Sequence, residues 1–324
     1  MRPALVLPVL ILTLLCLALV LGWPKGAHAP GKADASTHES VAHRDADVTL
    51  GTLAGDVSDP AQIPQNSLEG ALDVSNRYSF TVSVEANSSA TEEGVQLCSG
   101  LLLAPHLVLT AGHCVCGWHK PEADGDRGEA LIDRSGCASS ATITAMIYQP
   151  RKPGRVPTAI HDNHRGEVRP HPGLRIVRDA SGKLTTVHAN LALILLEEPV
   201  RDVAPPPMLA DSEARLDEPL ITVGYGNDER GAALHGERRF NTSRVVSLPE
   251  DRERILLSPP RQLLYQDDSG GPCLRESPEG DVLVGVSNRG LNSESSCLST
   301  YFHREWLEKA APRGSSANET RTSD

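Results

Sequence analysis

A short polar turn toward the C-terminal end of the chain combines a carboxylate, a hydroxyl and two glycines in the order Asp268-Ser269-Gly270-Gly271. A serine hydroxyl attacks a carbonyl group at neutral pH only if a base accepts its proton and nearby donors stabilise the oxyanion. Glycines in such a turn let the backbone approach a substrate closely. The turn therefore predicts nucleophilic chemistry at Ser269, provided that the rest of the chain supplies a base.

The candidate base is His113, which follows the apolar run Leu107 to Thr110 and directly precedes Cys114. Histidine gains and loses a proton near neutral pH, so it can take the proton of a serine hydroxyl and return it to a leaving group. The alternative is a structural histidine beside a disulfide.

The first 70 residues do not have the pattern of a folded domain. Ala4 to Leu21 is almost entirely apolar and follows Arg2, which predicts an export signal within residues 1–29. The apolar run is close to the lower limit for a membrane span, so an uncleaved N-terminal membrane anchor is the alternative. Residues 30–70 are polar and predict a disordered linker or pro-segment, and 313–324 a disordered tail. We expect a secreted, periplasmic or cell-surface protein.

Six cysteines lie beyond the signal, an even number that suggests three disulfides in an exported protein. Nearest neighbours along the chain would pair, although other connectivities are open. The predicted pairs are Cys98 with Cys114, Cys116 with Cys137, and Cys273 with Cys297. A competing zinc site would use Cys114, Cys116, His119 and Cys137, but it leaves Cys98 over and does not suit an oxidising compartment.

Charge gives little support for other ligands. The formal net charge of -11 provides no basic excess to neutralise phosphates, so we expect no nucleic-acid partner. The acidic stretch Asp124 to Glu129 has incomplete spacing for calcium ligands and is expected to be a solvated turn. We therefore expect no metal and no other cofactor.

Many short strand-like segments, some alternating and some continuously apolar, are joined by turn-rich connections, which predicts an all-β fold of two packed barrels or sandwiches. A final helix is predicted over 302–310, and a crossing linker over 199–218. The polar stretches 117–140 and 150–172 are expected to be long surface loops. Strands are predicted over 78–84, 101–103, 107–110, 141–148, 191–196, 220–224, 238–248 and 281–287.

Four blocks in order resemble the trypsin-like (chymotrypsin-fold, peptidase family S1) serine proteases, over roughly 70–313. These are Cys98-Ser99-Gly100 with Thr110 to Cys114, then Asn190-Leu191-Ala192-Leu193, then Val223-Gly224-Tyr225-Gly226, and finally Asp268 to Pro272. The resemblance implies two packed six-stranded antiparallel β-barrels with a short C-terminal helix, in a protease domain over 71–312. The first barrel would span 71–200 and the second 201–312. The family's activity implies a protein or peptide substrate, and we expect a monomer.

The chain departs from the family at catalytic positions. Asn190 stands where the family has the aspartate that orients the histidine, and an amide carries no charge to stabilise an imidazolium. Asp267 stands where the family has a glycine whose amide, with that of Ser269, lines the oxyanion hole. A carboxylate there opposes the developing negative charge unless it points to solvent.

The resemblance also locates the substrate pocket and the activation route. Leu263 would form the pocket floor, and Ser287 and Arg289 its wall, so a preference for basic side chains is not expected. In the family a new N-terminus pairs with the aspartate before the serine, here Asp268, but no Arg or Lys cleavage site of the family's type precedes the domain. The leading hypothesis is an exported serine endopeptidase acting through His113 and Ser269, weakened by Asn190. The alternative is an inactive pseudoprotease that binds a peptide or protein.

Overall fold

The structure is a computed structural model that describes residues 70–86, 96–121, 128–150, 158–226, 236–258, 268–288 and 295–311. All of them belong to one compact unit of the chain, Asp56–Asp324. The predicted export signal and tail, and nearly all of the predicted linker, lie outside these residues. In the described part of the chain, no helix has the length and apolar character needed to cross a membrane.

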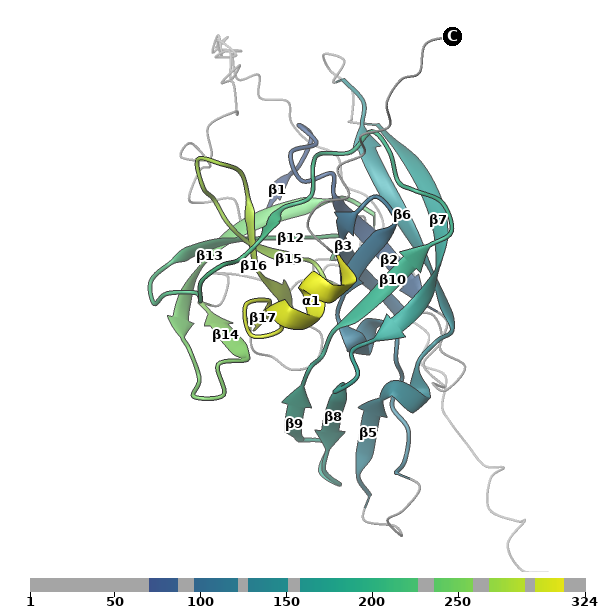
Figure 1. The fold of residues 1–324 in the computed structure, drawn as a ribbon, viewed down its shortest axis with the longest axis vertical. Helices are drawn as coiled ribbons and strands as arrows, with labels where there is room; N and C mark the ends of the chain where they lie inside the picture. The colour runs from purple at the N-terminus through teal and green to yellow at the C-terminus, as the bar shows by residue number, and fades with distance from the viewer. Residues whose placement is uncertain are drawn as a thin grey trace, which may run out of the picture. The chain divides into compact units, whose positions relative to one another are not determined.

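Six antiparallel strands close the first barrel in the order β10-β4-β3-β2-β6-β7 (Figure 1). The closure comes from pairing between β10 and β7, which leaves no free edge. Alternation places the side chains of Val82 and Val84 in the core, fully buried. The strands are β2 (Thr81–Ala86), β3 (Gln96–Ala104), β4 (Leu107–Thr110), β6 (Ser140–Tyr148), β7 (Ala159–Pro170) and β10 (Ala192–Leu196).

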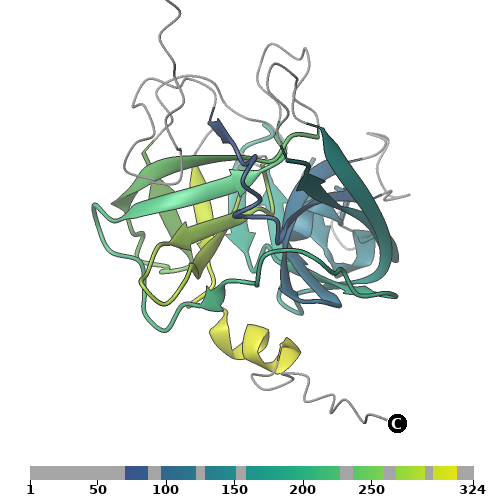
Figure 2. The ribbon, with the colours of Figure 1, turned by 90° about the horizontal axis from the view of Figure 1, so that it is seen from above.

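The second barrel follows the order β13-β12-β15-β16-β17-β14, and β13 pairs with β14 to close it. Figure 2 shows the two barrels side by side, the first in blue and teal and the second in green and yellow. The strands are β12 (Pro219–Gly224), β13 (Arg239–Ser247), β14 (Arg254–Leu257), β15 (Pro272–Arg275), β16 (Val282–Ser287) and β17 (Ser296–Ser299).

Shorter elements are added to the barrels. Strand β1 (Ala71–Leu72) pairs with β13 although the chain then enters the first barrel, and β11 (Met208–Leu209) pairs with β16 in parallel. A separate three-stranded sheet extends beside the first barrel (Figure 1). It consists of β5 (Ala130–Asp133), β8 (Arg175–Arg178) and β9 (Leu184–His188), and the helical elements are η2 (Gly112–Cys114), η3 (Arg134–Gly136) and α1 (Arg304–Ala310).

The predicted fold class is confirmed, since the chain forms two closed six-stranded antiparallel barrels with one short C-terminal helix. The expectation of surface loops over 117–140 and 150–172 was wrong in part. Strand β7 fills most of the second stretch, and β5 lies in the first. Most side chains of β7 are exposed, so its sequence is polar, but its backbone is hydrogen-bonded to both β6 and β10. A strand that exposes most of its side chains and is held by backbone hydrogen bonds shows no alternation of apolar residues in the sequence.

A buried ion pair connects the start of the domain to the second barrel. The guanidinium group of Arg238 donates from Nε to Asp73 at 2.8 Å, and both side chains are fully buried. The same guanidinium also donates to the main-chain oxygen of Met146 in β6 and to the hydroxyl group of Tyr225. Because every partner comes from a different segment, this cluster fixes the two barrels against each other.

Candidate active site

His113 lies in the single 3₁₀ turn η2, which begins just after the end of strand β4 of the first barrel. The turn is held to β3 by the disulfide between Cys98 and Cys114. Gly112 is packed so tightly that a Cβ there would lie 2.7 Å from a methyl carbon of Leu174 and 3.1 Å from Oδ1 of Asn190. The sequence Ala-Gly-His-Cys therefore brings the imidazole next to position 190.

The side chain of Asn190 makes three hydrogen bonds, and two of them go to His113. Its Oδ1 accepts the backbone N–H of His113 at 2.8 Å, and its Nδ2 lies 2.8 Å from Nδ1 of the imidazole. The same Nδ2 also donates to Oδ1 of Asn288. Asn190 is buried, so its amide is fully satisfied by protein groups.

These contacts determine which imidazole nitrogen carries the proton. A backbone N–H can only donate, so the Asn190 atom that receives it must be the oxygen, and the amide nitrogen must face the ring. The amide nitrogen is a donor, so Nδ1 of His113 must accept and the ring proton resides on Nε2. A general base for a serine hydroxyl needs the opposite tautomer, with a free lone pair on Nε2.

The environment of His113 also disfavours its charged form. Burial lowers the pKa of His113 to about 4, against a smaller upward effect of the hydrogen bond with Asn190. Arg178 adds a further downward effect through its positive charge. Among the described residues Nε2 has no hydrogen-bond partner, so His113 and Ser269 do not share a hydrogen bond through that nitrogen. A buried donor without an acceptor costs about 1–3 kcal/mol.

Ser269 lies in a turn that is tied to both barrels. Its carbonyl oxygen accepts the backbone N–H of Ser99 in β3 at 2.8 Å and lies 3.5 Å from Sγ of Cys114. The next residue, Gly270, donates to the carbonyl oxygen of Ser287 in β16 at 2.8 Å. The structure thus brings the Ser269 backbone next to Cys114, the neighbour of His113 in sequence.

Gly270 is required by this turn for two reasons. Its φ of 87° lies in the left-handed region, and a Cβ there would lie 2.1 Å from the carbonyl oxygen of Ser99. Asp268, on the other side of Ser269, accepts the backbone N–H of Gly226 at Oδ1, at 3.0 Å. The bend that follows β12 therefore supplies one partner of the aspartate that the family pairs with a new N-terminus.

Of the remaining predicted site residues, only Ser287 is described. It ends β16, is buried, and its backbone N–H donates to the carbonyl oxygen of Gly271. Asp267 of the predicted oxyanion hole lies outside the described residues, as do Leu263 and Arg289 of the predicted pocket and most of the acidic stretch 124–129.

The described residues form three disulfides, and these follow the nearest-neighbour pairing. The thiols of the alternative zinc site at Cys114, Cys116 and Cys137 are thus all oxidised. The bonds are Cys98–Cys114, Cys116–Cys137 and Cys273–Cys297.

Sequence reasoning assigned no role to two residues that complete this site. Asn288 is buried, and its Oδ1 accepts a hydrogen bond from the amide nitrogen of Asn190. In the sequence, only its position next to the predicted pocket residue Ser287 pointed to this role. Glu253 is buried and accepts the backbone N–H of Ala189, immediately before Asn190. No motif indicated Glu253, because its contacts come from segments far apart in the sequence.

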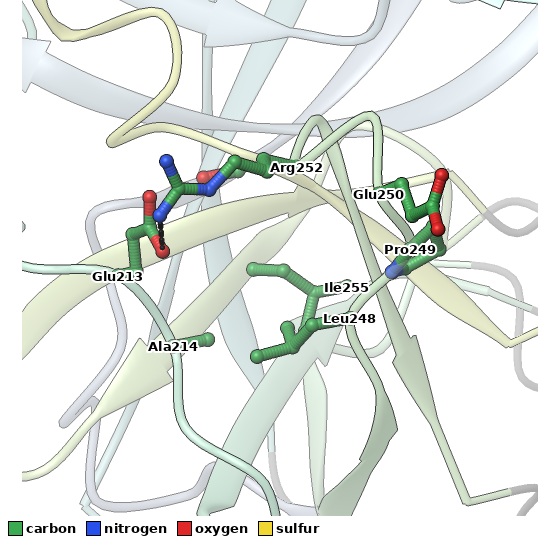
Figure 3. Close-up of a pocket in the computed structure, with 8 residues that line it drawn as sticks. Glu213, Ala214, Leu248, Pro249, Glu250, Arg252 and Ile255 are labelled. Atoms are coloured by element: carbon green, nitrogen blue, oxygen red, sulfur yellow. Dashed lines mark hydrogen bonds and ion pairs between the residues drawn. The ribbon is translucent and has the colours of Figure 1, made fainter.

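A hollow lies on the second barrel, and none of the described candidate site residues lines it. Its volume is about 350 Å³, and Ala214, Leu248 and Ile255 form its apolar part (Figure 3). Arg252 reaches across one side to Glu213, with a distance of 2.8 Å between the charged groups.

Comparison with known proteins identifies the family of this domain. The family model for trypsin matches residues 70–304. The solved structure of GrC is similar, with a TM-score of 0.52 and 13% identity, over 74% of this chain and 97% of that chain. The crystal structure of scabies mite inactivated protease paralogue S-I1 gives a TM-score of 0.49 and 17% identity, over 74% and 97% of the two chains. No curated protein matches the sequence. Since the family model covers more than half of its length, this chain belongs to the trypsin family.

Proposed function

We propose that this protein is an exported, trypsin-fold binding protein that holds a peptide or protein segment at the site of His113 and Ser269, with peptide hydrolysis suppressed. Three disulfides and family membership support an extracellular or periplasmic location. Binding is supported by the unsatisfied donor at Nε2 of His113. The atom is buried, so a segment that displaces the groups covering the ring would supply the missing carbonyl acceptor.

One observation carries the suppression of hydrolysis: the amide nitrogen of Asn190 faces Nδ1 of His113. Nε2 then carries the ring proton, so it has no free lone pair to accept the proton of Ser269. In trypsin-like proteases the exchange of this aspartate for asparagine is known to lower kcat about 10⁴-fold, a family value that we take over here. It corresponds to roughly 5–6 kcal/mol of activation free energy.

A slow serine endopeptidase is the second candidate, and the turn at Ser269 favours it. The glycine at 270 is retained in its left-handed conformation. The disulfide Cys98–Cys114 joins the neighbour of His113 to β3, where the backbone N–H of Ser99 binds the carbonyl oxygen of Ser269. Such geometry supports residual activity in any molecules whose ring adopts the other tautomer.

A fluorophosphonate probe separates the two candidates. The probe is added to the wild-type protein, to Ser269→Ala and to Asn190→Asp between about pH 6 and pH 10, a range in which an ordinary imidazole loses its proton. We expect no labelling of the wild type and clear labelling of Asn190→Asp at Ser269, because a carboxylate accepts Nδ1–H and frees Nε2. Slow labelling of the wild type that rises with pH and disappears in Ser269→Ala would establish the endopeptidase instead.

Binding is tested on the same full-length protein labelled with ¹⁵N at histidine. Fluorescein-labelled casein peptides are added, and the imidazole signals are followed. We expect the Nε2 signal of His113 to shift without cleavage of the peptides, while that of His161 in β7, an exposed residue, stays unchanged. Unchanged His113 signals at saturating peptide would overturn a binding role for this site.

A further inference from the structure

Glu253 is a buried carboxylate just before β14, in the second barrel, and three donors surround it. It accepts from Nδ1 of His188 at 2.8 Å, from Nε2 of His303 at 2.9 Å, and from the backbone N–H of Ala189. Burial raises the pKa of Glu253, but the hydrogen bonds from these three donors outweigh it and hold the pKa below its ordinary value. The carboxylate is therefore ionised at neutral pH.

The donors come from two separate segments, since His188 and Ala189 are consecutive residues. His188 ends β9 and has a half-exposed side chain, whereas His303 is buried at the start of α1. His171, from the segment after β7, packs edge-on against His303 with ring centroids 4.9 Å apart, and against Trp306 at 4.5 Å. Glu253 thus joins a loop of the first barrel to the second barrel and to the C-terminal helix.

The backbone at Ala189 explains what this cluster does. Ala189 is fully buried and has a φ of 48°, in the left-handed region that a residue with a Cβ rarely adopts. Its carbonyl oxygen accepts the N–H of Leu191 at 2.7 Å, so residues 189–191 form a very tight turn around Asn190. A strained conformation of this kind persists only where surrounding contacts impose it, and the N–H of Ala189 is bound by Glu253.

We propose that Glu253 is a positioning residue for position 190: its carboxylate imposes the left-handed turn at Ala189 and so holds the Asn190 amide against Nδ1 of His113. The inference rests on the proposed function, because it identifies what maintains the suppressed state. Glu253 acts across the barrel interface, on the backbone, and contacts neither His113 nor Ser269 among the described contacts.

The test reads the tautomer of His113 directly. Long-range ¹H–¹⁵N spectra of the full-length protein, labelled with ¹⁵N at histidine, report which imidazole nitrogen is protonated. In Glu253→Ala we expect loss of the single Nε2–H form of His113 and the appearance of a tautomer mixture. In Glu253→Gln, which keeps an oxygen acceptor for the Ala189 N–H, we expect the wild-type His113 signals. A folded Glu253→Ala protein with wild-type His113 signals would overturn the proposal.

A second variant covers the case in which Glu253→Ala does not fold. Glycine adopts a φ of 48° without strain, so Ala189→Gly combined with Glu253→Ala is expected to fold and to recover the Nε2–H form of His113. Failure of this double variant to recover that form would count against a role through the Ala189 turn.

A matched control removes another buried contact between the barrels. Asp73→Asn weakens the ion pair with Arg238 but does not touch position 190, so His113 should keep its wild-type signals. A change there equal to that in Glu253→Ala would mean general loosening and would overturn the specific role. Failure of the proposed function is visible separately, since the wild-type protein would then already show the Nδ1–H form.

Discussion

Asn288 accepts a hydrogen bond from the amide nitrogen of Asn190, the same nitrogen that faces the ring of His113. Both amide protons of Asn190 are therefore in use, and its oxygen is engaged by the backbone of His113. The asparagine at 190 is thus built into a polar network in which each polar atom of its uncharged side chain has a partner.

Removing the acceptor from this network should destabilise the fold. We expect Asn288→Ala to lower the free energy of unfolding by about 1–3 kcal/mol, since it leaves a buried N–H of Asn190 without a partner. Urea denaturation measures the change. As a control, Asn163→Ala removes an exposed hydrogen bond to Thr144 and should cost less than about 0.5 kcal/mol. Equal effects of the two substitutions would contradict the network.

Acid should destabilise the protein well above the pH at which carboxylates titrate. Burial lowers the pKa of His113 to about 4 and, together with the nearby His303 and His188, that of His171 to about 4. Between pH 6.5 and pH 4 the unfolded chain therefore binds more protons than the folded one. Stability is fully present above about pH 6.5 and is lost as the pH falls through this window.

Thermal unfolding between about pH 7.5 and pH 4, across the ordinary histidine range, tests this expectation. The melting temperature should fall with pH in the wild type, and less steeply in His113→Gln, which has no group to protonate at that position. His171 is only half buried, so its share should be smaller. A wild-type melting temperature that stays constant down to about pH 5 would contradict the lowered pKa of both histidines.

The buried pair of Asp73 and Arg238 should tolerate joint replacement better than loss of one partner. We expect Asp73→Ala to cost about 3–5 kcal/mol, because a fully buried guanidinium then loses its counter-charge. The double variant Asp73→Leu with Arg238→Met should recover part of that loss in urea denaturation. For comparison, Glu213→Ala breaks a solvent-exposed pair with Arg252 and should change stability by less than about 1 kcal/mol. A double variant no more stable than Asp73→Ala would show that the loss of stability in Asp73→Ala does not come from the unpaired guanidinium of Arg238.

Two glycines with similar backbone angles separate strain from steric overlap. Gly270 and Gly182 have φ of 87° and 82°, but an added Cβ meets the Ser99 carbonyl oxygen at 2.1 Å in the first case and nothing within 4 Å in the second. Gly182→Ala should therefore cost about 1–2 kcal/mol, from backbone strain alone. Gly270→Ala should cost clearly more and abolish probe labelling of Ser269 in the Asn190→Asp background. Similar losses of stability would contradict the tight contact between the serine turn and β3.

The sequence predicted the fold class, the strands whose side chains alternate, such as β2 and β6, and the short buried strand β4. It missed β7, because a strand with mostly exposed side chains and neighbours on both edges carries no apolar alternation. Family motifs brought His113, Asn190 and Ser269 to attention in the right order. The orientation of the Asn190 amide could not be predicted, since it depends on a backbone N–H 77 positions earlier in the chain. Glu253 was invisible for the same reason: its partners His188 and His303 become neighbours only after folding.

Each end of the described chain contacts the barrel that lies farther from it in the sequence. Strand β1 is hydrogen-bonded to β13 of the second barrel, and Trp306 of α1 packs on His171 of the first. A nick by a protease in the segment between β10 and β12 would therefore not release two halves. Each fragment would stay bound to the terminus of the other. The cut protein should therefore migrate as one species under native conditions and separate on denaturation even without reduction, because each of the three disulfides lies within one fragment.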